Sequence, residues 1–206
     1  MIAEEIFTTQ LFDVLNKMAK EGFNHAANGL EGMVGQPLRF HEPKTDLVEL
    51  LRLPDSLGGL EKEAVGIYLI ADGDFRGQIM LILPLEKGFE MADMVLQREP
   101  GTTKELNSLE RSALAEVGNL TGSFFLSTIE RITGLATRPS PPAVIVDMVG
   151  AILNIVIAGS AMVSDYAIMF ETALEVSGQT TEAKFWVIPD TEVLQRFKER
   201  SIKAYG

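Results

Sequence analysis

Apolar residues recur along this chain first at helical spacing and then in short strand-like runs, and this order occurs twice. Residues 4–34 and the stretch from about Thr103 to Thr133 carry apolar side chains at helical spacing, and each predicts a long amphipathic helix. Short runs rich in β-branched residues, bounded by proline or glycine, follow each helix and predict strands. The hydrophobic pattern therefore predicts a repeated arrangement of one long helix and several strands.

In the first half, turn signals separate the apolar runs. The predicted elements are a short strand at Leu38–His41, two strands at Ala64–Ala71 and Gln78–Pro84, and a helix at Glu86–Leu96. The polar stretch Lys44–Gly59 is interpreted as a loop with a helical turn near Leu47–Leu51. Residues 99–103, Glu-Pro-Gly-Thr-Thr, end this half and form the clearest boundary in the chain.

The second half repeats this order after its long helix. The Pro-rich stretch Arg138–Ala143 leads into strands. The later predicted elements are two hairpin strands at Ala167–Leu174 and Lys184–Pro189 and a final helix at Thr191–Ile202.

The apolar stretch Ala143–Val163 is long enough to span a bilayer, so a membrane helix has to be compared with buried strands. Asp147 and Asn154 interrupt it, and an internal aspartate costs about 2.5–3.5 kcal/mol near the bilayer centre. Its many valines and isoleucines, together with Gly150 and Gly159, favour two buried strands joined by a turn.

The two halves also share polar positions, since Glu21 and Asn24 precede Glu116 and Asn119 by 95 residues. We interpret residues 1–206 as one α+β domain of two pseudo-repeats, about 1–100 and 101–206. Each repeat would be an α-β-β-β-α unit, and together they would form a pseudo-two-fold antiparallel sheet flanked by long helices. A parallel α/β fold would need a crossover after most strands, which the predicted hairpins disfavour.

Composition narrows the classes of partner. The formal net charge of −11 disfavours binding to nucleic acid or to an anionic membrane, because both would repel the chain. The chain has no cysteine, so disulfides, thiolate chemistry and zinc–cysteine sites are excluded. The first residues lack the basic and apolar regions of a signal peptide, and we therefore expect a cytoplasmic protein.

One group of polar residues stands out on the second long helix. Ser112, Glu116 and Asn119 lie at positions i, i+4 and i+7, which places them in one stripe of the helix surface. Pro142 follows Asn119 after 22 residues, giving the spaced pattern Asp/Ser-x3-Glu-x2-Asn-x22-Pro. A carboxamide both donates and accepts hydrogen bonds, so Asn119 has the chemistry to orient a water molecule without titrating.

This pattern resembles the motif of the CheC/CheX/FliY chemotaxis phosphatases. The resemblance includes Glu116-Val-Gly-Asn119, the run Pro141–Met148 and the strand Phe185–Pro189 followed by a helix, and it extends over nearly the whole chain. It implies hydrolysis of the aspartyl-phosphate of phosphorylated CheY. By this resemblance, Asn119 would position the attacking water, Glu116 would contact the regulator, Ser112 would precede them on the helix and Pro142 would end the motif.

The resemblance also indicates a second site on the first helix, formed by Glu21 and Asn24. This copy departs from the pattern, because Lys17 stands where Asp or Ser is expected and Pro43 follows Asn24 after only 18 residues. We expect no cofactor bound by the chain itself, since His25 and His41 are isolated, and the required Mg²⁺ would belong to the partner regulator.

Two further functions remain open at this point. The chain could be a non-catalytic interaction module that binds the receptor deamidase CheD, or an adaptor related to the flagellar switch proteins. The chain ends at Gly206 without a further predicted domain, which favours a free-standing CheC-like protein over a switch component. A small-molecule sensor has no support from particular residues.

Overall fold

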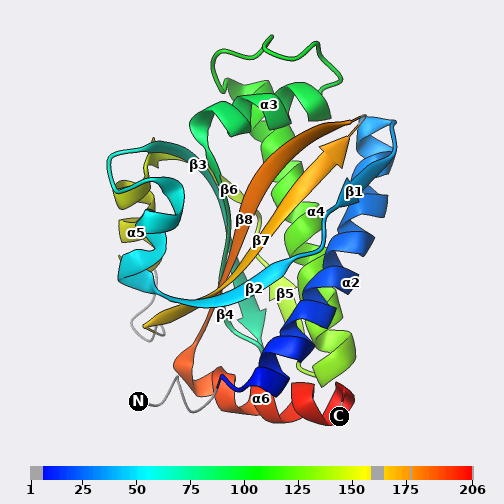
Figure 1. Cartoon of the computed structure of the whole chain (residues 1–206), viewed down its shortest axis with the longest axis vertical. Coiled ribbons are helices and arrows are strands. Elements are labelled where there is room, and N and C mark those ends of the chain that lie inside the picture. Colours follow the sequence, from blue (N-terminus) through cyan, green and yellow to red (C-terminus); the bar gives the residue numbers. More distant parts are fainter. Residues whose placement is uncertain (1–6, 159–164, 177, 206) are drawn as a thin grey trace.

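The protein is described here by a computed structural model that covers residues 7–158, 165–176 and 178–205. Figure 1 shows a sheet with helices on both faces and at both ends. The first half contains α2 (Thr9–Val34), β1 (Leu38–Phe40), β2 (Lys44–Glu49), the 3-10 helix η1 (Leu50–Leu57), β3 (Glu63–Gly73), β4 (Gly77–Pro84) and α3 (Leu85–Val95). The second half contains α4 (Ser108–Thr133), β5 (Thr137–Pro139), β6 (Ala143–Met148), α5 (Val149–Ala158), β7 (Tyr166–Val176), β8 (Gln179–Pro189) and α6 (Thr191–Tyr205).

The eight strands of the described residues form one antiparallel sheet, in which the two halves exchange strands. The hairpins β3–β4 and β7–β8 meet along β4 and β8 at the centre. The first half's β1 and β2 pair with β7 of the second half, while β5 and β6 of the second half pair with β3 of the first. The predicted α+β class with an antiparallel sheet is confirmed. The division of residues 1–206 into two repeats of one domain stays an interpretation.

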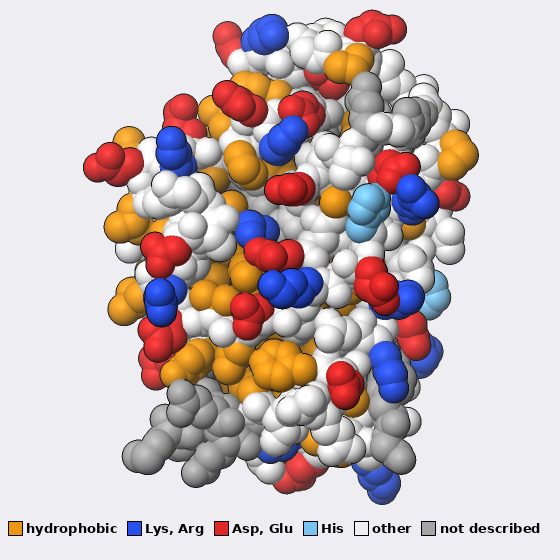
Figure 2. Space-filling view, in the orientation of Figure 1, with side chains coloured by type: hydrophobic (Ala, Val, Ile, Leu, Met, Phe, Trp, Pro, Cys, Tyr) orange, Lys and Arg blue, Asp and Glu red, His pale blue; other side chains and the backbone are white. Residues whose placement is uncertain are grey.

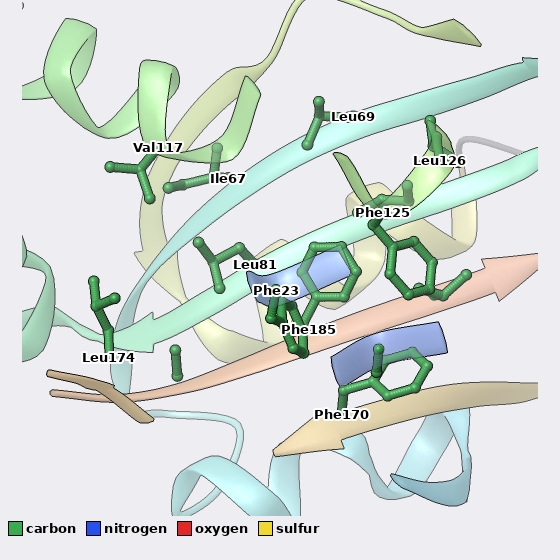
Figure 3. Close-up of a cluster of buried hydrophobic side chains, with 14 of the residues drawn as sticks. Phe23, Ile67, Leu69, Leu81, Val117, Phe125, Leu126, Phe170, Leu174 and Phe185 are labelled. Atoms are coloured by element: carbon green, nitrogen blue, oxygen red, sulfur yellow. The ribbon is translucent and has the colours of Figure 1, made fainter. Parts of the chain in front are cut away.

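The sheet separates two apolar cores. The larger core lies beneath α2 and α4, which run side by side on one face (Figure 1), and it includes Phe23, Phe125, Phe170 and Phe185, whose rings gather in Figure 3. The smaller core lies on the other face, under η1 and α5, around Trp186. The two long helices are therefore fixed to the sheet along their whole apolar faces, and their opposite faces remain exposed.

The prediction of a loop at Lys44–Gly59 is wrong. Lys44–Glu49 is strand β2, and Leu50–Leu57 is the 3-10 helix η1. Residues 44–49 are mostly polar because β2 lies at the side of β7 with most of its side chains exposed or partly exposed, so no apolar run marks it. The pairing of β2 with β7 is made to residues more than a hundred positions away, which local sequence does not reveal.

The prediction of two strands in Ala143–Val163 is half wrong. Ala143–Met148 is strand β6, but Val149–Ala158 is helix α5, and residues 159–163 lie outside the described part of the chain. The buried residues of α5 are Val149, Ile152, Leu153 and Val156, a helical spacing that overrides the strand propensity of its valines and isoleucines. Among the described residues, no helix is long and apolar enough to cross a membrane.

The repeated unit is also longer than predicted. Within the described residues, each half has a long helix, four strands and a final helix, with a helical segment (η1 or α5) between its second and third strands. The missed elements are β2 and η1 in the first half and β5 and α5 in the second. Helix α4 starts later than expected, at Ser108, and α2 begins at Thr9, while residues 4–6 of the predicted first helix lie outside the described part of the chain.

Candidate functional site

Helix α4 lies unusually close to strand β3, and two glycines make this possible. A Cβ atom added at Gly118 would lie 2.2 Å from Cγ2 of Ile67, and one at Gly122 would lie 3.2 Å from a methyl carbon of Leu69. Val117 is buried in the same interface, and Figure 3 shows it beside Ile67. Ile67 is fully buried and β-branched, so it has little room to move. Gly118, which lies between Glu116 and Asn119 in the sequence, therefore sets the distance between α4 and the sheet at this point.

The outward face of this helix carries the predicted residues. Ser112 and Glu116 are exposed and Asn119 is partly exposed, while Ala113, Val117 and their neighbours are buried against the sheet. Among the described residues, no side-chain hydrogen bond or ion pair engages Ser112, Glu116 or Asn119. The hydroxyl, carboxylate and amide are thus displayed together on a rigid helix with their hydrogen-bonding capacity unused.

The start of α4 is anchored by a polar network that the sequence interpretation missed. Asn107 and Glu110 form a capping box, in which the Asn107 N–H donates to the Glu110 carboxylate over 3.0 Å. Arg98 donates to the same carboxylate over 2.7 Å. The buried Asp93 accepts a bond from the N–H of Thr103 over 2.8 Å. This network ties the α3–α4 connection to the first turn of α4, immediately before Ser112.

The charge of Glu110 is stabilised in this position. The hydrogen bond from Arg98, together with backbone N–H donors at the helix start, holds the pKa of Glu110 below its ordinary value of 4.5. The spacing Asn107-x-x-Glu110 was visible in the sequence as a capping signal and would have moved the predicted helix start from Thr103 to Ser108.

Pro142 lies at the start of the strand beside α4. It is half-buried and directly precedes β6, which pairs with β3. Arg111 connects the two elements, since its guanidinium donates to the carbonyl oxygens of Leu106 in the connection before α4 and Val144 in β6. Arg111 thus connects α4, which carries the motif residues, to β6, which follows Pro142, through hydrogen bonds to backbone oxygens.

The two halves of the structure define which residues of α2 correspond to this site. Helices α2 and α4 both have 26 residues, and their starts, Thr9 and Ser108, are 99 positions apart. Their left-handed glycine caps, Gly35 and Gly134, show the same offset of 99. The strand pairs β1/β5 and β2/β6 also begin 99 positions apart. The 95-residue register inferred from Glu21 and Asn24 is therefore wrong by one helical turn.

At the structural offset of 99, the first half carries different residues. Asp13 corresponds to Ser112, Lys17 to Glu116 and Lys20 to Asn119, and Pro43 corresponds to Pro142. The first half thus has the pattern Asp13-x3-Lys17-x2-Lys20-x22-Pro43, with the motif's spacing intact and its two central residues replaced by lysines.

The residues first proposed for this half lie one turn further along α2. Glu21 is half-buried and forms an ion pair with Arg131 of α4, which links the two long helices. Asn24 is exposed and lines a surface hollow with Phe23 and residues 39–43. The structure brings Glu21 and Asn24 to neighbouring turns but does not place them at the counterparts of Glu116 and Asn119.

Metal binding by the chain itself has no candidate among the described residues, where no three histidine or carboxylate side chains form a cluster that could hold an ion. The charged side chains of both signs are interspersed over the face seen in Figure 2, with apolar areas between them. Because Ser112 and Glu116 are exposed and Asn119 is partly exposed on the outer face of α4, the candidate site is a helix surface that another protein can contact.

Comparisons with known proteins agree with this geometry. The sequence model of the CheC-like family matches residues 109–146, which begin in the first turn of α4 and end in β6. The CheY-P phosphatase CheC of Bacillus subtilis is 23% identical over 188 residues, which cover 89% of this chain and 90% of that protein.

Solved structures share the fold over nearly the whole length. FliY of Thermotoga maritima has a TM-score of 0.76 at 17% identity and covers 96% of this chain and 98% of its own. FliM from a FliM–SpeE complex of H. pylori has a TM-score of 0.70 at 10% identity, covering 94% and 97%. In the motif on α4, in the alignment with a CheC over 89% of its length and in the fold shared with FliY, this chain is similar to proteins of the CheC/CheX/FliY family.

Proposed function

We propose that this protein hydrolyses the aspartyl-phosphate of a phosphorylated CheY-type response regulator and that the face of α4 is the working site. The observation that carries the proposal is the display of Ser112, Glu116 and Asn119 on one rigid helix face, with no internal partner among the described residues. The similarity to the B. subtilis protein named CheY-P phosphatase supports the same reaction class.

Asn119 has the chemistry for orienting the attacking water. Its carboxamide accepts a hydrogen bond from the water and donates one toward a neighbouring oxygen, and it does so without changing protonation between pH 5 and 9. Holding a water in line with phosphorus supplies most of what a protein contributes to phosphoryl transfer. In this proposal Asn119 contributes position rather than charge or base strength.

Glu116 would make the electrostatic contact with the partner. It is exposed, one turn before Asn119, and no cation among the described residues pairs with it, so it is available to pair with a lysine of the regulator. Ser112 lies one further turn toward the start of the helix and extends this contact surface. The nearest arginine, Arg111, already donates to the carbonyls of Leu106 and Val144.

The side chains on the α4 face indicate which groups each of the two proteins would supply to the reaction. A phosphoryl group needs cationic stabilisation in the transition state, and the α4 face offers an amide and a carboxylate instead. The Mg²⁺ ion and the lysine would therefore belong to the regulator, and the chain would bring the water. We propose no cofactor bound to the protein itself.

The decay of phosphorylated CheY in the presence of Mg²⁺ tests the proposal. Wild type should accelerate the decay, and Asn119→Ala should reduce that acceleration by about 100-fold, since it removes the group that positions the water. Asn24→Ala, which removes the same amide from the exposed face of α2, is the matched control and should leave the acceleration unchanged. No acceleration by wild type would overturn the proposal.

The alternative of a non-catalytic interaction module, including binding to CheD, stays a prediction from the sequence. Likeness to FliM concerns the fold alone. Binding of phosphorylated CheY by wild type without any acceleration of its decay would favour this alternative over the enzyme.

A further inference from the structure

The first half of the molecule contains a surface that corresponds, position by position, to the α4 site. Asp13, Lys17 and Lys20 are exposed on α2 at the places that Ser112, Glu116 and Asn119 occupy on α4. The burial patterns of the two helices also coincide at this offset, so both helices turn the same face outward. The surface is thus a counterpart of the site with different side chains.

The supporting structure around this surface is also repeated. On α2, the side-chain oxygen of Asn16 accepts bonds from the backbone N–H of Thr45, over 3.1 Å, and from its hydroxyl, over 2.5 Å. Thr45 is the counterpart of Val144, whose carbonyl accepts a bond from Arg111 on α4. Each long helix is therefore tied to the same position of the strand that follows the motif proline, β2 in one half and β6 in the other.

A hollow lies beside Lys20, between α2 and the β1–β2 connection. It encloses about 390 Å³ and is lined by Lys20, Phe23, Asn24 and residues 39–43, ending at the buried Pro43. The counterpart of Asn119 thus lies at the rim of an open depression that a partner's loop can approach.

The two lysines are unsuited to the chemistry of this position. The ammonium group of Lys20 has three donors and no acceptor, so it cannot take a hydrogen bond from a water, and it is paired with Glu42 over 2.9 Å. Lys17 places a positive charge where Glu116 places a negative one, and it would repel a cation on the partner.

We propose that this face of α2 is a dormant copy of the α4 site, silenced by Lys17 and Lys20. The inference rests on the proposed function, because it assigns the same reaction to the same arrangement of residues. It also means that the chain works on one regulator molecule at a time, through α4 alone.

Restoring the two residues tests the proposal. In an Asn119→Ala background, the pair Lys17→Glu and Lys20→Asn should raise the acceleration of phosphorylated CheY decay roughly tenfold above that background. The matched control carries Lys17→Glu with Lys20→Ala, which restores the charge without the amide, and should stay at background. A parallel version adds Glu42→Ala, because Lys20→Asn leaves Glu42 without its cation.

The outcomes separate the dormant copy from the proposed function. Lys17, Lys20 and Glu42 are exposed and Asn119 is partly exposed, and circular dichroism establishes that each variant is folded. If wild type accelerates the decay but neither restored version rises above the background, the dormant copy is overturned and the function of α4 stands. A rise in the alanine control also overturns it, because the amide would then not be responsible. If wild type itself is inactive, the proposed function fails and the dormant copy with it.

Discussion

The two long helices of this protein are alike in almost every respect except how they meet the sheet. Both have 26 residues, both end in a left-handed glycine, and both bury corresponding positions. Where α4 has Gly118 and Gly122 against β3, α2 has Ala19 and Phe23. Phe23 fills the space below α2 with an aromatic ring that contacts Phe40, Phe170 and Phe185.

This difference separates the features that serve the fold from those that would serve the proposed reaction. Helix length, caps and the buried stripe are common to both halves, so they serve the packing of either helix on the sheet. The close glycine contact, the capping box and the Ser112–Glu116–Asn119 stripe occur in the second half and not at the corresponding positions of the first. Under the proposed function, activity is therefore a local property of α4 on a shared scaffold.

The largest expected effect comes from making the second half resemble the first. Asn119→Lys should abolish the acceleration of phosphorylated CheY decay, a loss of about 100-fold or more, because the ammonium group cannot accept a hydrogen bond from the water. Ser123→Lys is the control, since Ser123 lies one turn further along α4 at the counterpart of Asn24. Equal losses in both variants would mean that any added lysine on this face blocks the partner. The loss in Asn119→Lys could then not be assigned to the missing hydrogen-bond acceptor.

The next effect concerns the height of the helix above the sheet. Gly118→Ala should lower the free energy of unfolding, because its Cβ would overlap Ile67 and overpacking costs about 1–3 kcal/mol, against a gain of ~1 kcal/mol from alanine in a helix. The displaced α4 should also lose phosphatase activity. Urea denaturation and the decay assay measure the two quantities.

The reverse substitution on the other helix provides the control. Ala19→Gly, at the counterpart of Gly118, should cost about 2 kcal/mol, through helix propensity and the loss of one buried methyl group, and leave the decay rate unchanged. If Gly118→Ala retains full stability and activity, the close contact with Ile67 has no role in presenting the site.

A smaller effect is expected from the network at the start of α4. The pKa of Glu110 is lowered in the folded state, so its contribution to stability is complete above the ordinary value of 4.5 and is lost as the pH falls through the lower folded value. Glu110→Gln should therefore make the stability of the protein less dependent on pH below about pH 5. Urea denaturation at several pH values between 6 and 3 measures this change.

The first half supplies the comparison for this prediction. The pKa of Glu42 is also lowered, by the hydrogen bond from Lys20, but both side chains of that pair are largely exposed. Glu42→Gln should flatten the pH profile less than Glu110→Gln does, because solvent screens the exposed pair. An equal or larger effect of Glu42→Gln would contradict the greater importance assigned to the α4 anchor.

The smallest effect belongs to the ion pair between the two long helices. Glu21→Ala and Arg131→Ala should each cost ~0.2–1 kcal/mol, the usual value for an exposed pair, and neither should alter the decay of phosphorylated CheY. The double variant measures the coupling between them. A loss of activity in Glu21→Ala alone, with Arg131→Ala unaffected, would return Glu21 to the list of catalytic candidates and contradict the 99-residue register.

Sequence alone predicted most of the regular elements and the polar stripe on α4. The apolar runs within β3, β4 and β8 are continuous and mostly buried, so they leave a clear signal. Strand β2 was missed because its residues are mostly polar and its partner is remote. Helix α5 was mistaken for a strand because its composition favours one, although its buried residues follow a helical spacing.

The register between the halves could not be fixed from the helix pattern alone. A shift of four residues rotates a helix by only about 40°, so Glu21 and Asn24 matched the face of Glu116 and Asn119 nearly as well as Lys17 and Lys20 do. The glycine caps and strand starts distinguish the two registers, and they become certain only in the structure. The contact between Arg98 and Glu110 was missed because the two residues meet across the α3–α4 connection, whose path the local sequence pattern does not predict.

The exchange of strands between the halves has a consequence for how the chain folds. Arg39 on β1 binds Glu175 on β7, which lies 136 positions later in the chain. Similarly, β3 gains a neighbouring strand on its outer edge only when β6 of the second half pairs with it. Neither half can complete its share of the sheet from its own residues, so an early nucleus confined to one half would leave open strand edges. Contacts of such long range slow folding, and we expect a single slow cooperative phase in which the site on α4 forms together with the whole sheet.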